Sequence, residues 1–87
     1  MEITLFITEI TNYLYNKVDD YDYNSIEDYF ETFVEDLEID IISNLNDVHI
    51  NFKYDNNIYI VSNLNGFKLF HSSLINKIRK KKMKRIL

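Results

Sequence analysis

Apolar residues recur every three to four positions in the first part of the chain. Ile3, Phe6 and Ile10 fall on one side of a helical wheel, and the threonines between them fall on the other. This spacing is typical of an amphipathic helix that buries one face. The pattern predicts a first helix over residues 2–17.

A second helical pattern follows a polar segment over residues 19–23. Asn24 precedes Glu27 by three positions, which is the spacing of a capping box. Apolar residues continue at helical spacing from Ile26 to Ile41. We therefore expect a second helix along this stripe and, with the first, an acidic helical half over residues 1–40.

From Val48 the period of the pattern changes to two, which predicts a strand. Asp55-Asn56-Asn57 has turn chemistry, and residues 58–64 are expected to form a second strand. Asn65-Gly66 is a strong signal for a tight hairpin turn and leads into residues 67–71. These features predict a β-meander of three strands over residues 48–71.

Ser72 or Ser73 can cap a last helix. Its apolar positions include Ile75 and Ile78, and most of its other residues are basic, so a basic C-terminal helix is expected over residues 74–87. The predicted order is α-α-β-β-β-α. The fold class is α+β, a single small domain over residues 1–87 in which a three-stranded antiparallel meander packs against the helices.

Composition limits the class of protein. Eighty-seven residues, 46% of them hydrophobic, suffice for one core. The absence of cysteine excludes disulfides and thiolate metal sites. The longest apolar run has four residues, over 58–61, and the start lacks the basic residues of a signal peptide, so we expect no membrane span and a cytoplasmic location in the host cell. Abundant Ile, Asn, Lys and Tyr indicate an A/T-rich genome, such as that of a low-GC bacterium or its phages.

Charge divides the chain into two halves. Residues 1–40 carry a net charge of −11 and residues 41–87 a net charge of +7, for a total of −4. Along the predicted second helix the carboxylates recur about every 3 Å, close to the phosphate spacing of about 3.4 Å along one DNA strand. The pattern predicts a surface that binds a basic protein groove. The expected partner-binding residues are Asp19, Asp20, Tyr21, Asp22, Tyr23, Glu27, Asp28, Glu31, Glu35, Asp36 and Glu38.

Two other interpretations of the charges stay open. The acidic face is either simply solvated or is neutralised by the basic tail of the same chain. The tail itself is an alternative site for contact with nucleic-acid phosphates. Its residues are Lys77, Arg79, Lys80, Lys81, Lys82, Lys84 and Arg85.

A calcium site is a further, weaker alternative. The acidic segment resembles an EF-hand loop, with matches at positions 1, 3, 5, 9 and 12 of that pattern. These matches are Asp20, Asp22, Asn24, Asp28 and Glu31. Ser25 replaces the glycine of position 6, and Glu27 stands where the family has an apolar residue. We therefore expect no metal site.

Catalytic chemistry has little support in the sequence. His49 and His71 are the only histidines, and neither belongs to a metal-binding or acid–base pattern. The neighbouring serines are better explained as helix caps. We expect no catalytic residues, no cofactor, no small-molecule substrate and no enzymatic activity.

Small size, low-GC composition, missing catalytic residues and a one-sided carboxylate surface together resemble small phage-encoded inhibitors of the anti-CRISPR and DNA-mimic type. The resemblance covers residues 19–40. It implies a non-enzymatic protein that occludes the basic nucleic-acid-binding groove of a host defence or nucleic-acid-processing protein or ribonucleoprotein. The alternative is a small regulatory protein that binds nucleic acid through its basic C-terminal helix.

Overall fold

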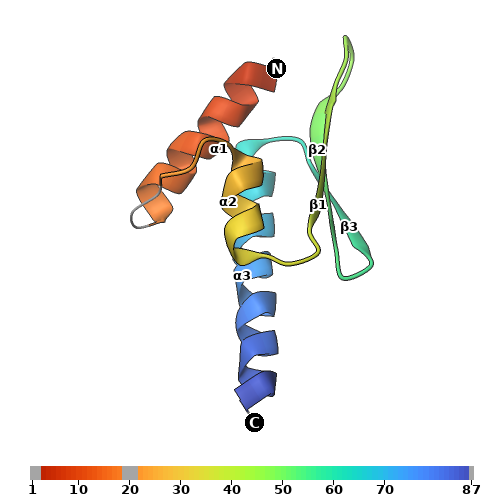
Figure 1. Ribbon diagram of the computed structural model, residues 1–87. Coiled ribbons are helices and arrows are strands. Elements are labelled where there is room, and N and C mark those ends of the chain that lie inside the picture. Colours follow the sequence, from red (N-terminus) through yellow and green to blue (C-terminus); the bar gives the residue numbers. More distant parts are fainter. Residues whose placement is uncertain (1–2, 19–21, 87) are drawn as a thin grey trace.

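The computed structural model describes residues 3–18 and 22–86, and it places their side chains except those of Phe33 and of residues 81–86. The elements follow the order α-α-β-β-β-α (Figure 1). They are α1 (Ile3–Lys17), α2 (Ile26–Phe33), β1 (Glu38–Ser43), β2 (Val48–Tyr54), β3 (Asn57–Val61) and α3 (Leu64–Ile86). The α+β class and this element order confirm the prediction from the sequence.

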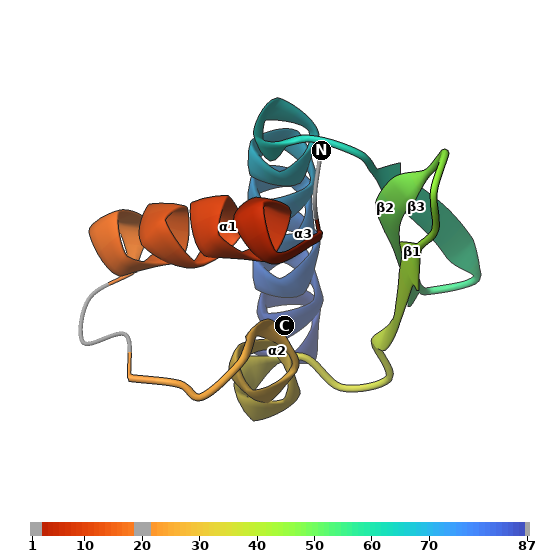
Figure 2. The same ribbon diagram turned by 90° about the horizontal axis from the view of Figure 1, so that it is seen from above.

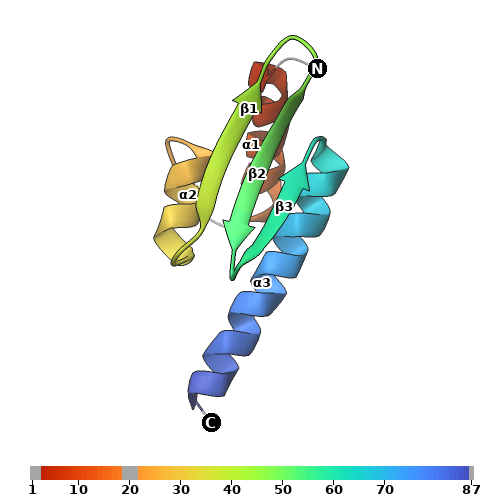
Figure 3. The same ribbon diagram turned by 90° about the vertical axis from the view of Figure 1, so that its right-hand side faces the viewer.

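The strands form one antiparallel sheet in the order β1-β2-β3, with β2 in the middle. All three helices lie on the same face of the sheet, so the other face has no covering layer within the described part of the chain (Figure 2). Seen from that open face, α2 lies behind the β1 edge and the first half of α3 behind the β3 edge (Figure 3).

The core lies between the helices and the covered face of the sheet. α1 contributes the stripe predicted for it, including the buried Phe6, Ile10 and Leu14. At the centre Phe30 of α2 packs edge to face on Phe52 of β2, with ring centroids 5.5 Å apart. Aromatic side chains therefore join the helices and the sheet into one core.

The second helix is shorter than predicted, and its cap is Ser25 rather than Asn24. The Ser25 hydroxyl accepts a hydrogen bond from the backbone N–H of Asp28 at 3.1 Å. The helix ends at Phe33, and after a turn the chain enters β1, so the expected continuation to Ile41 is wrong. The physical reason is that alternate residues of 38–43 face the core, and a neighbouring strand satisfies their backbone groups.

The predicted strand over residues 67–71 is also wrong, because these residues belong to α3. Asn63 caps this helix, since its side-chain oxygen accepts from the N–H of Gly66 at 2.8 Å. The Asn65-Gly66 pair therefore lies in the first turn of a helix rather than in a hairpin. Ser72 and Ser73 are exposed positions inside the helix and do not cap it.

α3 starts ten residues before the predicted 74 and is the longest element, with 23 residues. Its first half packs on the core, and its basic second half extends beyond the body of the domain (Figures 1 and 3). The molecule is accordingly elongated, at 49 × 30 × 20 Å. No helix within the described residues has the length and apolar character needed to cross a membrane.

Candidate functional site

Eight carboxylates of residues 22–40 lie on or beside α2, on the turn that follows it and on β1, and this stretch contains no lysine or arginine. We call this set the acidic surface. It consists of Asp22, Glu27, Asp28, Glu31, Glu35, Asp36, Glu38 and Asp40. Three of the eight are carried by the helix, and the predicted single acidic helix is replaced by a surface built from two elements and a turn.

The packing of α2 positions its part of the acidic surface. Ile26, Tyr29 and Phe30 are buried against the core, while Glu31 on the same helix is exposed. The Tyr29 hydroxyl is 2.8 Å from Nε2 of His71 on α3, a buried hydrogen bond that ties the two helices together. The carboxylates of α2 are therefore presented by a helix that is fixed to the core.

The sheet register determines the orientation of the acids on β1. Ile39 and Ile41 stand opposite Phe52 and Ile50 of β2 and face the core. Because successive side chains of a strand point to opposite faces, Glu38 and Asp40 must point to the open face of the sheet. The structure thereby adds Asp40 to the predicted set, which ended at Glu38.

A tight turn joins the two acidic elements. Asp36 has a φ of 61°, in the left-handed region that aspartate tolerates better than most residues. Glu35 and Asp36 are both exposed in this turn. The chain therefore reverses from α2 into β1 without losing its carboxylates, and the acidic surface continues across the turn.

None of the eight carboxylates forms an ion pair with a lysine or arginine among the described side chains. Glu38 stands opposite Lys53 in the sheet register, yet no ion pair joins them. Asp47, which lies outside the acidic surface, contacts Nδ1 of His49 at 3.0 Å. Within the described residues, neutralisation by the basic half of the chain is therefore not seen.

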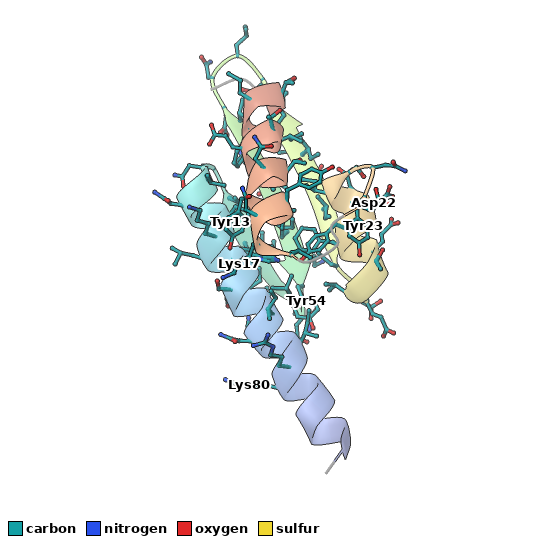
Figure 4. All side chains as sticks on the ribbon, turned by 90° about the vertical axis from the view of Figure 1, so that its left-hand side faces the viewer. Tyr13, Lys17, Asp22, Tyr23, Tyr54 and Lys80 are labelled. Atoms are coloured by element: carbon teal, nitrogen blue, oxygen red, sulfur yellow. The ribbon has the colours of Figure 1, made fainter. Side chains whose placement is uncertain are left out.

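The remaining predicted partner-binding residues are unevenly placed. Asp19, Asp20 and Tyr21 lie outside the described residues. Tyr23 is half-buried and packs edge to face on Tyr29 with centroids 5.4 Å apart, so it supports α2 (Figure 4). Asp22 beside it is exposed (Figure 4).

The calcium alternative gains no support from this geometry. Asp28 and Glu31, two of its proposed ligands, lie inside α2, whereas the pattern needs Asp28 in a loop. Asp20 lies outside the described residues. Across residues 3–18 and 22–86, no group of three or more histidine or acidic side chains is arranged to hold a metal ion.

The basic residues of α3 differ in their surroundings. Lys77 donates a hydrogen bond to the Tyr59 hydroxyl of β3, and its ammonium group lies 4.8 Å from the centroid of that ring. Arg79 and Lys80 are exposed. The side chains of Lys81, Lys82, Lys84 and Arg85 lie outside the described set. Lys77 thus fastens α3 to the sheet, and the residues after it continue along the projecting part of the helix.

His71 is a buried core residue with 1% of its surface exposed. Burial, and secondarily the positive charge of Lys17, lower its pKa from 6.5 to about 4, so the ring is neutral at pH 7. Its Nδ1 has no hydrogen-bond partner within the described residues. The ring stacks on Phe67, with centroids 5.7 Å apart. The adjacent Ser72 is exposed on α3.

A feature that the sequence analysis missed is a groove between β3 and α3, with a volume of about 400 Å³. Ile58 and Ile60 of β3 and Leu69 of α3 line it and are exposed. The apolar run Ile58 to Val61 predicts a strand, but the expected strand over residues 67–71 would have made it the middle strand of the meander. No signal in the sequence therefore placed these isoleucines at the edge of the sheet.

Comparison of the chain with protein-family models, curated proteins and solved structures finds no match.

Proposed function

We propose that this protein is a non-enzymatic inhibitor that docks its acidic surface on the basic nucleic-acid-binding groove of a host protein or ribonucleoprotein. The observation that carries the proposal is that eight carboxylates share one region of α2 and β1, with no ion-pair partner among the described side chains. A surface of one charge sign attracts a partner of the other sign and steers their encounter.

The unpaired state of the carboxylates favours docking. An acid already paired within the protein would have to break that pair before it could bind a lysine or arginine of a partner. The exposed Glu31, Glu35 and Glu38 carry no such cost. Because α2 is packed on the core and β1 belongs to the sheet, little conformational entropy remains to be lost on binding.

Charge reversal on the acidic surface tests the proposal. A panel of purified basic nucleases, with a DNA duplex as competitor, serves as the probe. We expect the parent protein to bind at least one nuclease in competition with DNA. The double variant Glu31→Lys, Glu35→Lys should lose at least about 100-fold in affinity, because like charges facing each other across an interface cost several kcal/mol. Calorimetry or surface plasmon resonance measures the loss.

A matched pair of variants separates a local effect from one of net charge. Glu31→Gln with Glu35→Gln raises the net charge by two, and so does Asn12→Lys with Asn76→Lys at exposed positions of α1 and α3. The first pair should weaken binding more than the second. Equal effects, or full binding by the charge-reversed variant, would contradict docking through the acidic surface.

A second candidate function is nucleic-acid binding through the basic end of α3. The observation in its favour is that this end extends beyond the body of the domain, where a phosphate backbone can approach it (Figure 3). Lysine and arginine contacts with phosphates make such binding strongly dependent on salt. The acidic half would then limit binding to unsuitable partners.

Truncation after Lys80 distinguishes the two candidates. Ile78, which packs against the core, is retained, so we expect cooperative unfolding at an unchanged temperature. The lost residues include four positive charges, which changes the net charge from −4 to −8. The truncated chain should associate with a basic nuclease faster than the parent does. Slower association, with a loss of salt-dependent DNA binding, would favour the second candidate.

A further inference from the structure

The face of the sheet opposite the helices (Figure 2) carries acidic side chains along one margin and apolar side chains along the other. The strand register places Glu38 and Asp40 of β1 on this open face, and it places Ile58 and Ile60 of β3 on the same face. Glu38 lies in one row with Ile58, and Asp40 lies in one row with Ile60. We call the first pair the acidic margin and the second pair the apolar margin.

The apolar margin is exposed, and its surface continues onto α3. Ile58 is 65% exposed and Ile60 67%, and Leu69 of α3, which is 75% exposed, lines the groove beside them. Ile42 at the far end of β1 faces the same side of the sheet and is half-buried. Exposed apolar side chains that gather in one place are typical of a surface that binds another molecule.

The acidic margin keeps its charge. Glu38 and Asp40 form no ion pair among the described side chains, although Lys53 stands opposite Glu38. Between the two margins β2 presents Lys53, Asn51 and His49 to the open face. Lys53 is the only lysine or arginine of the three strands. The open face therefore has a net negative charge on the side of β1 and an apolar surface on the side of β3.

We propose that the open face binds one amphipathic α-helix of the basic partner, with the apolar side of that helix over β3 and its lysines and arginines over β1. The inference rests on the proposed function, because Glu38 and Asp40 belong to the acidic surface that faces the partner. It adds a contact with Ile58 and Ile60, which lie outside the acidic surface, and it names the kind of element that the partner supplies.

The size of the open face fits one helix. Neighbouring strands lie about 4.8 Å apart, so the outer strands of this three-stranded sheet are separated by about 10 Å. A helix with its side chains is about 10–12 Å wide. The seven residues of β2 extend over about 23 Å, which a helix of about 15 residues spans. Because helices already cover the other face, the added helix would complete a three-layer arrangement.

The charges favour a basic partner over a second copy of this chain. If two copies pack their open faces together with their strands aligned, a two-fold axis places β1 over either β1 or β3 of the other copy. In the first arrangement Glu38 and Asp40 approach the same acids, and in the second they are buried against isoleucines. Both arrangements cost free energy, because they desolvate carboxylates without sufficient counter-charge. The same acids repel a nucleic acid or an anionic lipid surface.

Peptide binding to the whole protein tests the proposal. The probe is a synthetic helix of about 15 residues with leucines along one side, lysines along the adjacent side and alanines elsewhere. One control peptide has alanine in place of the leucines, and another has glutamate in place of the lysines, so both keep helix-forming residues. Fluorescence titration should show that the probe binds at least about 10-fold more tightly than either control. In NMR spectra the probe should shift the amide signals of Ile58 and Ile60 more than that of Glu31 on α2.

Variants of the open face separate the apolar contact from the charges. Ile58→Thr with Ile60→Thr keeps β-branched side chains and should weaken binding of the probe at least about 10-fold, with unchanged circular dichroism. The control Leu5→Gln with Leu45→Gln removes two exposed leucines from α1 and from the turn between β1 and β2, and it should leave binding unchanged. Lys53→Gln removes the positive charge between the two margins and should strengthen binding about two- to five-fold.

The failure of this inference differs from the failure of the proposed function. No binding of the probe, equal binding of the peptide without leucines, or full binding by the double threonine variant would overturn the inference. A nuclease that binds through Glu31 and Glu35, while the probe leaves the amides of Ile58 and Ile60 unshifted, would overturn it alone. Binding of the probe to the open face, with no nuclease bound by the protein, would instead contradict the proposed function.

Discussion

The substitution Phe30→Ala is expected to lower the free energy of unfolding by about 3–5 kcal/mol. Phe30 is buried, and its ring centroid lies 5.5 Å from that of Phe52 and 6.2 Å from those of Phe67 and Phe70. Alanine would leave a cavity where α2, α3 and the sheet meet. Because small domains are stable by only about 5–15 kcal/mol, the loss is a large fraction of the total.

Urea denaturation followed by circular dichroism measures this effect. The control is Leu45→Ala at a fully exposed position, which should change the stability by less than about 0.5 kcal/mol. A cost below about 1 kcal/mol for Phe30→Ala would show that α2 does not depend on this contact. The variant should also weaken binding through the acidic surface, because Phe30 holds the helix that carries Glu31.

Acidification is expected to destabilise the protein by about 3 kcal/mol through His71 alone. Burial, with a smaller effect from Lys17, lowers the pKa of His71 from 6.5 to about 4 in the folded protein. Below pH 6.5 the unfolded chain takes up a proton that the folded chain does not. The full contribution of neutral His71 is thus present above pH 6.5 and is lost as the pH falls through about 4, at about 1.4 kcal/mol for each pKa unit.

Urea midpoints between pH 7.5 and 5 isolate this histidine, because ordinary carboxyl groups titrate near pH 4. The variant His71→Phe should lose the decrease in stability over this range, although it also removes the hydrogen bond between His71 and Tyr29. The control His49→Asn, at a position paired with Asp47 on the opposite face of the sheet, should retain the decrease. An unaltered decrease in His71→Phe would assign the pH dependence to other groups.

α1 was predictable because its helical apolar stripe continues along the whole segment. Its Thr and Ile content also suits a strand, and Ile3, Leu5 and Ile7 alternate, but the alternation stops at Glu9, whereas Phe6, Ile10 and Leu14 keep helical spacing and are buried. The strand β2 was predictable for the same reason, since Ile50, Phe52 and Tyr54 alternate with polar residues. A segment whose apolar residues follow a single period, helical or alternating, folds as that period indicates when another element is available to cover its apolar face.

Residues 34–41 fit both periodicities. Val34, Leu37 and Ile41 have helical spacing, but Leu37, Ile39 and Ile41 also alternate. Pairing with β2 decided between the two, because it buries Ile39 and Ile41 over the core and supplies hydrogen bonds to the backbone. The acidic surface was accordingly predicted on the right segment and with nearly the right residues, but as a single helix instead of a helix, a turn and a strand.

Residues 63–71 were misread because the local turn signal disagreed with the pattern of burial. Asn65-Gly66 suits a hairpin, but Phe67, Phe70 and Leu74 recur with helical spacing and are all buried. Asn63 was available as a cap four residues before Phe67. Long-range packing of this helix on Phe30 and Phe52 outweighs a turn preference that involves only two residues.

The sequence by itself determined the α+β class, the amphipathic first helix, the central strand and the separation of charge between the halves of the chain. These follow from residue identity and local spacing, which do not depend on distant contacts. Only the tertiary structure decided that residues 38–43 join the sheet, that His71 is neutral in the core and that Ile58 and Ile60 lie at an open edge. Each of these depends on which residues from other elements surround a position, because burial and hydrogen-bond partners are properties of the assembled fold.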